Sequence, residues 1–156
     1  MITTSLLSFL IASNMINVPI EDVECLALNI YHEARNQSEL GQLAVSHVVL
    51  NRVASKKYPN TICKVIKKAR YSAGKPVRNK CHFSWYCDGL PDDPKEHKAW
   101  QDSMRSAYSA YVMYELGVDV TSGSVMYHAN YVNPYWKSAY KRTVRIDSHI
   151  FYKEKK

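Results

Sequence analysis

Apolar residues in the first third of the chain recur at helical spacing. Within residues 22–34 they lie three or four positions apart and form one stripe: Val23, Leu26, Ala27, Ile30 and Ala34. This spacing predicts an amphipathic helix. Residues 39–53 are apolar around most of a helical circumference. They predict a second helix, nearly surrounded at the centre of the fold, with Ser38 as its N-terminal cap.

Turn and loop residues interrupt the middle of the chain. A turn at residues 58–61 leads into a short predicted helix that ends near residue 68. Residues 69–79 are rich in Lys, Arg, Ser, Gly and Pro, and we expect an exposed loop there. The aromatic segment 81–89 is expected to be extended, to close with an Asp-Gly turn and to form a cleft wall.

A long helix is expected next. Asp93 suits the N-terminal cap, Pro94 the first helical position, and Glu96 can reach back to the cap. Gly117 marks the end of this helix.

The pattern changes to strands late in the chain. Residues 124–128 predict a strand, and residues 143–152 predict a hairpin around Asp147 and Ser148. The expected fold class is therefore α+β and mainly helical, with a small β-sheet or hairpin late in the chain.

Length indicates one domain. The 156 residues suffice for a single core, and we expect residues 21–156 to form it. Residues 1–20 contain an apolar run that is too short to span a bilayer, and no basic residue precedes that run. We expect an N-terminal arm packed on the domain, with an atypical export signal as the alternative.

The net charge of +7 favours an anionic partner, and charge alone admits nucleic acid, an anionic membrane or the bacterial cell wall. Basic residues crowd the C-terminal end: Lys137, Lys141, Arg142, Arg145, Lys153, Lys155 and Lys156. One part of the surface should be much more basic than the rest. A solvated basic face and a polyanion-binding face both fit this pattern.

The even cysteine count is compatible with two disulfides and an oxidising destination. The sequence leaves the pairing open among Cys25, Cys63, Cys81 and Cys87. Zinc binding is the rival, since His82 and His97 lie near the last two cysteines, but no recognised zinc-ligand spacing is present.

Glu33 is the most informative residue for function. It lies seven residues after Leu26, on the flank of the first apolar stripe. Desolvation there raises the pKa of a carboxyl group, so the group can stay protonated near neutral pH and donate its proton. Cleavage of a glycosidic bond needs such an acid. The alternative is a partly buried Glu that pairs with a nearby Arg.

Several segments together resemble the cell-wall hydrolase family of the SleB type, which includes spore-cortex-lytic enzymes and their bacterial and phage relatives. The similarity covers residues 24–152. The segments that carry it include Tyr31-His32-Glu33-Ala34-Arg35, Gly41-Gln42-Leu43-Ala44-Val45, Leu50-Asn51-Arg52-Val53, Cys87-Asp88-Gly89, Met126-Tyr127-His128-Ala129 and Ile146 to Tyr152.

This resemblance implies a compact lysozyme-like domain with a catalytic Glu at the end of its first conserved helix, here Glu33. It implies cleavage of the bond between N-acetylmuramic acid and N-acetylglucosamine in peptidoglycan, as a lytic transglycosylase that leaves a 1,6-anhydro sugar. One carboxyl group suffices for this reaction. A phage endolysin that acts outside the cytoplasmic membrane fits the same resemblance.

Supporting roles are expected for several side chains near Glu33. Tyr127 and His128 would orient the sugar or hydrogen-bond the catalytic carboxyl group. Aromatic stacking on sugar rings is expected from Phe83, Tyr135 and Trp136. Arg35 would hold a substrate carboxylate or pair with Glu39. We expect glycan strands as the partner, and neither nucleic acid, a stable membrane anchor, a metal nor another cofactor; the protein should be a monomer.

Three alternatives stay open from the sequence, and a fourth, a zinc protease, fails at Asn36. A hydrolytic muramidase would use a second carboxylate, and Asp88 and Asp92 are the candidates. An N-acetylmuramoyl-L-alanine amidase would need zinc or a Cys nucleophile. A zinc protease would extend the His32-Glu33 pair to a second His four residues on, but that position is Asn36. A basic glycan- or nucleic-acid-binding module without turnover would explain the charge and the aromatic residues but not Glu33.

Overall fold

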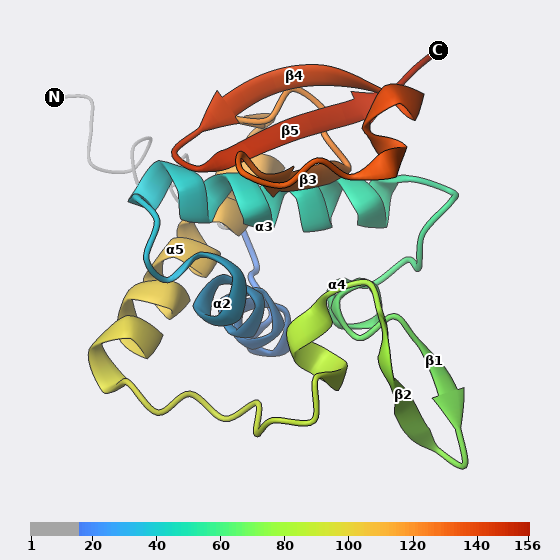
Figure 1. Cartoon of the computed structure of the whole chain (residues 1–156). Helices are drawn as coiled ribbons and strands as arrows, with labels where there is room; N and C mark the ends of the chain where they lie inside the picture. The colour runs from blue at the N-terminus through green and yellow to red at the C-terminus, as the bar shows by residue number, and fades with distance from the viewer. Residues whose placement is uncertain (1–15) are drawn as a thin grey trace, which may run out of the picture.

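Helices are the most abundant secondary structure in the computed structural model, which describes residues 16–156. The prediction for residues 1–20 therefore falls almost entirely outside the described residues. The two predicted N-terminal helices are present as α2 (Ile20–Ala34) and α3 (Glu39–Ala54). Ser38 caps α3, because its hydroxyl accepts a hydrogen bond of 3.2 Å from the Gly41 amide. Figure 1 shows α3 lying between the helical layer and the late sheet, as expected for the most enclosed helix.

The expected loop at residues 69–79 is wrong, because this segment forms an antiparallel hairpin. The short helix α4 (Ile62–Ile66) leads into β1 (Ala69–Ser72) and β2 (Lys75–Cys81). Ala73 and Gly74 between the strands both have positive φ, as in tight two-residue turns. The hairpin is largely solvent-exposed, so its sequence lacks the apolar alternation that would have indicated strands.

The aromatic segment after the hairpin is helical rather than extended. It forms the 3-10 helix η1 (Ser84–Cys87), which is followed by the predicted Asp-Gly turn. Gly89 has a φ of 86°, and the Asp88 carboxylate accepts a 2.8 Å hydrogen bond from the Leu90 amide.

The long helix starts later than predicted, as α5 (His97–Glu115), and ends before Gly117. The sequence suggested a cap at Asp93, but the structure supplies a different partner for the helix entry. The Tyr31 hydroxyl accepts hydrogen bonds of 3.1 Å from the amides of Lys95 and Glu96. A tertiary contact therefore replaces the local capping box.

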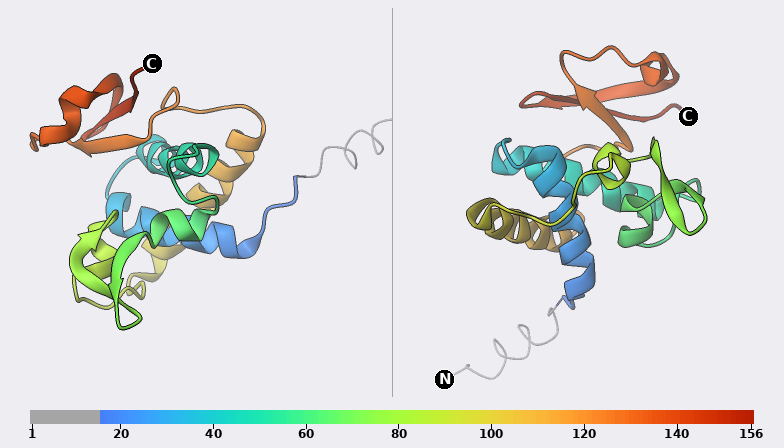
Figure 2. Two further views of the ribbon diagram at one scale, coloured as in Figure 1. Left: turned by 90° about the vertical axis from the view of Figure 1, so that its right-hand side faces the viewer. Right: turned by 60° about the horizontal axis from the view of Figure 1, so that its bottom comes forward.

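The late strands form one antiparallel sheet in the order β3-β5-β4. Its strands are β3 (Met126–Ala129), β4 (Tyr140–Ile146) and β5 (His149–Glu154), and the 3-10 helix η2 (Tyr135–Ala139) precedes β4. The predicted strand and hairpin are thus confirmed. Figures 1 and 2 show this sheet stacked on α3, on the side away from α2 and α5. The α+β, mainly helical fold class is confirmed.

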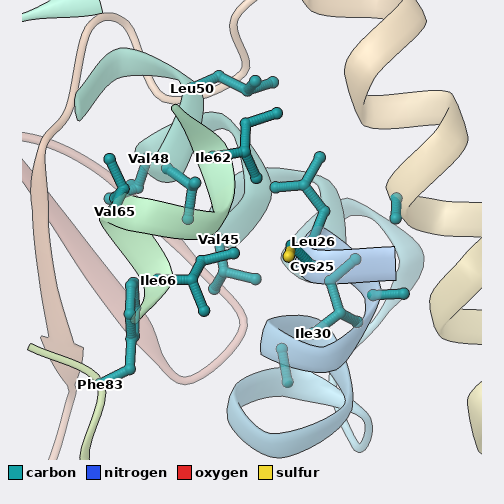
Figure 3. Close-up of a cluster of buried hydrophobic side chains, with 14 of the residues drawn as sticks. Cys25, Leu26, Ile30, Val45, Val48, Leu50, Ile62, Val65, Ile66 and Phe83 are labelled. Carbon is teal, nitrogen blue, oxygen red and sulfur yellow. The ribbon is translucent and has the colours of Figure 1, made fainter. Parts of the chain in front are cut away.

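One hydrophobic core joins the helices, and Figure 3 shows part of it. Leu26 and Ile30 from α2 meet Val45 and Val48 from α3, and Ile66 from α4 closes the cluster. All four cysteines form disulfides: Cys25 with Cys63, which ties α2 to α4, and Cys81 with Cys87, which joins β2 to η1. The disulfide interpretation of the sequence is therefore confirmed, and it excludes zinc binding by these thiols.

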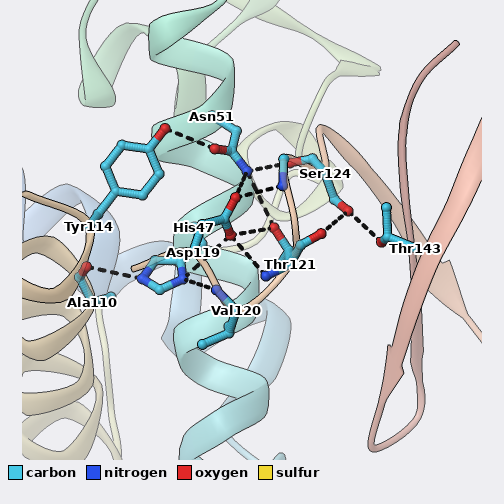
Figure 4. A network of polar contacts seen from close by, with 10 residues as sticks. His47, Asn51, Ala110, Tyr114, Asp119, Val120, Thr121, Ser124 and Thr143 are labelled. Atoms are coloured by element: carbon cyan, nitrogen blue, oxygen red, sulfur yellow. Dashed lines mark hydrogen bonds and ion pairs between the residues drawn. The ribbon is translucent and has the colours of Figure 1, made fainter. Parts of the chain in front are cut away.

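A buried polar network fixes the back of α3 (Figure 4). His47 is fully buried; its Nε2 lies 3.1 Å from the Ala110 carbonyl oxygen, and its Nδ1 accepts a 3.1 Å hydrogen bond from the Val120 amide. Nδ1 is therefore unprotonated and the ring is neutral. Burial also lowers the pKa of His47. His47 is therefore a structural histidine.

Candidate active site

A cavity of about 410 Å³ lies where the end of α2 meets the late sheet. Its lining includes His32, Glu33 and Arg35 from the end of α2 and the residues beyond it, and Ser148 and His149 from the β4–β5 turn and the start of β5. Glu33 contributes the only carboxylate among the lining residues. The cavity therefore offers one titratable acid to a ligand.

Glu33 is held by a residue from the opposite wall. The Tyr127 hydroxyl on β3 donates a hydrogen bond of 2.9 Å to Oε2 of Glu33. Burial raises the pKa of Glu33, while the Tyr127 hydrogen bond and the nearby charge of Arg52 act against this shift. Burial and the Glu33 charge in turn raise the pKa of Tyr127 well above its usual range, so the phenol stays protonated and donates.

Arg52 is a functional candidate that the sequence analysis did not single out. Its side chain is buried within the apolar part of α3, and Nε donates a 2.8 Å hydrogen bond to the Val125 carbonyl oxygen. The guanidinium carbon lies 5.2 Å from the ring centroids of Tyr58 and Phe83. An Arg inside an otherwise apolar helix was the available signal, because a buried charge needs a counter-charge or an acceptor.

His149 is a second candidate missed from the sequence. Only 7% of it is exposed, yet Nδ1 has no hydrogen-bond partner among the described residues. Its ring centroid lies 5.0 Å from that of Tyr127, and burial lowers the pKa of the imidazole. His149 is part of the cavity lining, and its unpartnered Nδ1 is buried just behind that lining. Strand alternation places His149 on the same inward face as Phe151, which was the available signal.

The two walls of the cavity are hydrogen-bonded to each other. Asp147 Oδ2 accepts hydrogen bonds from the Ser38 amide at 2.8 Å and from the Ser38 hydroxyl at 2.6 Å. Oε1 of Gln37 accepts from the amide and the hydroxyl of Ser148, at 3.3 and 3.0 Å. The corner between α2 and α3 thus holds the β4–β5 turn in place. Gly41 permits this close approach, because a Cβ at that position would lie 2.5 Å from Asp147 Oδ2.

His32 is also part of the cavity lining. Its ring stacks on Trp85 of η1 with centroids 4.5 Å apart, and Nε2 lies 2.8 Å from the Asp92 carbonyl oxygen. The aromatic segment therefore packs against a lining residue, but none of residues 81–89 lines the cavity, so they do not form the expected cleft wall there.

Two of the sequence-derived supporting residues reach the cavity. Tyr127 contacts Glu33 directly, and Arg35 is part of the lining. Arg35 pairs with Glu96 at 3.5 Å instead of with Glu39, and it also donates a hydrogen bond to the Tyr31 carbonyl oxygen. Both groups of the Arg35–Glu96 pair are well exposed, so the pair adds little to stability.

The other four supporting residues lie elsewhere. Phe83 is 3% exposed and packs in the core, so it has no free face for a sugar. His128 lies 2.9 Å through Nε2 from the Tyr152 hydroxyl instead of contacting Glu33. Trp136 packs its ring against His128 and Tyr152, whereas Tyr135 is 96% exposed. None of the four belongs to the cavity lining.

The two candidates for a second carboxylate also lie outside the cavity lining. Asp88 forms the Asp-Gly turn, and the backbone carbonyl of Asp92 faces His32. Within residues 16–156, no group of three His, Cys, Asp or Glu side chains is placed to hold a metal ion. No helix in this part of the chain is long and apolar enough to cross a membrane.

Most of the chain is similar to known cell wall hydrolases. Residues 36–152 match the family model described as Cell Wall Hydrolase, so the match begins just after Glu33. A spore cortex-lytic enzyme from Bacillus cereus is 45% identical over 49 residues, which make up 31% of this chain. That match spans only 19% of the relative's own length.

Two solved structures are similar over most of the chain. The catalytic domain of the germination-specific lytic transglycosylase SleB from Bacillus anthracis is 26% identical, with a TM-score of 0.65 over 88% of this chain and 98% of that one. The catalytic domain of the Bacillus cereus SleB protein is also 26% identical, with a TM-score of 0.62 over 89% and 94% of the two chains. The predicted lysozyme-like fold is confirmed by these matches.

Proposed function

The chain belongs to the cell wall hydrolase family, and from that premise we propose that it cuts the glycan strands of peptidoglycan as a lytic transglycosylase. The observation that carries the proposal is the single carboxylate, Glu33, in the cavity lining. A lytic transglycosylase needs one acid that later acts as a base, whereas a hydrolytic glycosidase ordinarily uses two carboxylates.

Glu33 would perform both proton transfers. The raised pKa favours the protonated form of the carboxyl group, and this acid would donate its proton to the glycosidic oxygen of the leaving sugar. The carboxylate that forms is stabilised by the Tyr127 hydroxyl and by the charge of Arg52. It then accepts the proton of the C6 hydroxyl as that oxygen closes the 1,6-anhydro ring.

His149 would bind the sugar beside this acid. His149 is part of the cavity lining, and its buried Nδ1 has no partner among residues 16–156. A hydroxyl or N-acetyl group would complete its hydrogen bonding after a movement of the ring that exposes this atom. We assign His149 to substrate positioning, since Glu33 supplies the proton transfers. Arg35 at the cavity edge suits a carboxylate on the lactyl group or the peptide stem.

The rival activities have less support. A muramidase lacks its second carboxylate in the cavity, because Asp88 and Asp92 do not line it. A Cys-dependent amidase lacks its nucleophile, because all four cysteines form disulfides. A binding module without turnover does not account for a carboxyl group that is buried, hydrogen-bonded and placed in a cavity.

Mass spectrometry of digested sacculi tests the proposal. We expect muropeptides that end in 1,6-anhydro-muramic acid and none after treatment with the Glu33→Gln variant. Glu39→Gln is the matched control, because Glu39 is an exposed carboxylate six residues away that is not part of the cavity lining. New reducing ends would instead identify a muramidase, and freed stem peptides an amidase.

The proposed place of action is the wall outside the cytoplasmic membrane. Two disulfides suit an oxidising location. We also propose a role as a phage endolysin, which is supported by the resemblance to phage lysins and by the net charge of +7. Added to permeabilised bacteria, the oxidised protein should lower the turbidity of the suspension, whereas the Glu33→Gln variant should not.

A further inference from the structure

One segment accounts for the positive charge of the whole protein. Residues 55–80, here called the basic lobe, contain nine of the 21 basic residues and none of the 14 acidic ones. The rest of the chain holds fewer basic than acidic residues. The cluster of basic residues at the C-terminal end is therefore the smaller of two basic regions. Outside the basic lobe, acidic residues outnumber basic ones, so they offset the charge of the C-terminal cluster.

The cations of the basic lobe face solvent and are mostly unpaired. The lobe comprises the loop after α3, then α4 and the β1–β2 hairpin, which protrudes from the helical body in Figures 1 and 2. Within residues 16–156, Lys57 is its only cation that forms an ion pair, with Glu154 at 3.1 Å. Of the others, only Lys68 is partly buried. Asp88, Asp92 and Asp93 follow the lobe and border it near Lys67, but they are too few to neutralise it.

Both ends of the lobe are fixed to the body. The disulfide between Cys25 and Cys63 holds α4 on α2, and that between Cys81 and Cys87 holds the end of β2 on η1. The charges thus sit on a preorganised surface, which loses less conformational entropy on binding than a flexible basic tail.

The lobe also has a fixed position relative to the cavity. Trp85 lies in η1 between the Cys81–Cys87 disulfide and the cavity wall, and its ring stacks on His32. The base of the hairpin is therefore connected to the cavity lining through the Cys81–Cys87 disulfide and the Trp85–His32 ring pair.

We propose that the basic lobe binds a linear, phosphate-bearing polymer of the cell wall and so retains the enzyme on the wall next to the glycan. A dense set of cations matches a polyanion with closely repeated charges, because each neutralised phosphate releases a counterion. Tyr71 is the only large apolar side chain that the lobe exposes, whereas surfaces that enter membranes expose several. The choice of a wall polymer over other polyanions rests on the proposed function.

A charge-matched pair of variants tests this proposal. The lobe variant changes Lys64, Lys67, Arg70 and Lys80 to Gln, and the control changes Lys137, Lys141, Arg142 and Lys156 to Gln. Each set removes three Lys and one Arg, all exposed and none in the cavity lining. Binding is measured in the Glu33→Gln background, to intact walls that carry poly(glycerol phosphate) and to the same walls stripped of it, so failure of the proposed catalysis would not obscure the result.

We expect the lobe variant to bind intact walls at least tenfold more weakly at 50 mM salt, and the control variant to bind as the parent does. The slope of log K against log salt should fall by about 3 for the four charges removed. When Glu33 is retained, the lobe variant and the control variant should both cut soluble glycan fragments at the rate of the parent protein.

Three results would overturn the proposal. One is equal weakening in the control variant, which would mean that only net charge matters. Another is that the parent protein binds stripped walls as tightly as intact walls. This comparison does not depend on the folding of any lobe or control variant. The third is tighter binding to duplex DNA than to the wall polymer at the same salt, which would make nucleic acid the partner.

Discussion

The hydroxyl of Tyr127 donates a 2.9 Å hydrogen bond to Oε2 of Glu33 and thereby joins the end of α2 to the edge of the late sheet. The two residues are 94 positions apart, so the acid has its final environment only when the sheet docks on the helices. The bond favours the charged form of Glu33, while burial favours the neutral form. If Glu33 is the catalytic acid proposed above, the balance between these two effects sets the pH range in which the enzyme is active.

Tyr127→Phe removes the hydrogen bond that lowers the pKa of Glu33, whereas the burial that raises this pKa remains. The pKa of Glu33 should rise further, so the alkaline limb of the kcat/KM profile should move to higher pH by about one unit. The turnover number should fall about tenfold, because the carboxylate formed in the first step loses a donor. Tyr152→Phe is the control, since that hydroxyl contacts His128 instead. An unmoved alkaline limb would show that Tyr127 does not tune the acid.

Glu33→Gln should stabilise the protein at neutral pH. Burial raises the pKa of Glu33 above its unfolded value, so its favourable contribution is complete below the unfolded pKa and is lost as the pH rises through the folded pKa. Thermal unfolding should therefore give a higher Tm than the parent at pH 7.5 and an equal Tm at pH 4. A lower Tm at pH 7.5 would contradict a carboxyl group that is destabilised by burial. Glu39→Gln should change neither value, because Glu39 is exposed.

His149→Phe should raise KM and lower kcat/KM about tenfold or more, because a buried hydrogen-bonding group is lost beside the sugar. His149→Gln, which keeps a donor and an acceptor, should recover part of this loss. In the Glu33→Gln background, the ¹⁵N resonances of the His149 ring should shift when glycan fragments are added. Unchanged resonances would exclude contact with the sugar, and His128 serves as the internal control because it does not line the cavity.

The two disulfides should contribute unequally to stability. Cys25 and Cys63 are 38 residues apart, and Cys81 and Cys87 only 6. Loop-closure entropy predicts about 4 kcal/mol for the longer loop and about 2 kcal/mol for the shorter one. Urea unfolding of the two double Cys→Ala variants measures both values. Equal losses would show that chain entropy is not the main source of the stabilisation.

Periodic apolar segments allowed the sequence to predict much of this fold. The starts of α2 and α3 were right to within two residues, and the hairpin around Asp147 was found. The β1–β2 hairpin was missed because its exposed strands have no apolar face to reveal them. The start of α5 was misplaced because the capping partner, Tyr31, is distant in sequence.

The site was predictable only where a single helix carries it. Helix phase and local composition pointed to Glu33, and the family resemblance supplied its role. For Arg52 and His149 the local pattern indicates only burial, through a charge in an apolar helix and an inward strand position. Their place near Glu33 and Tyr127 depends on contacts between elements that are distant in the sequence. Phe83 was misjudged for the opposite reason, since an aromatic residue near a cleft and one in the core have the same local sequence signature.

The hydrogen bonds between Ser38 and Asp147 and between Gln37 and Ser148 connect the α2–α3 corner directly to the β4–β5 turn on either side of the cavity. Closing the two sides further over a polymer would break these bonds. Under the proposed function, a glycan strand would therefore enter from the side and be cut without a preceding closure. Bonds in the interior of a strand are then as reachable as those at its ends, and the wall would be opened at many points instead of being trimmed from its termini.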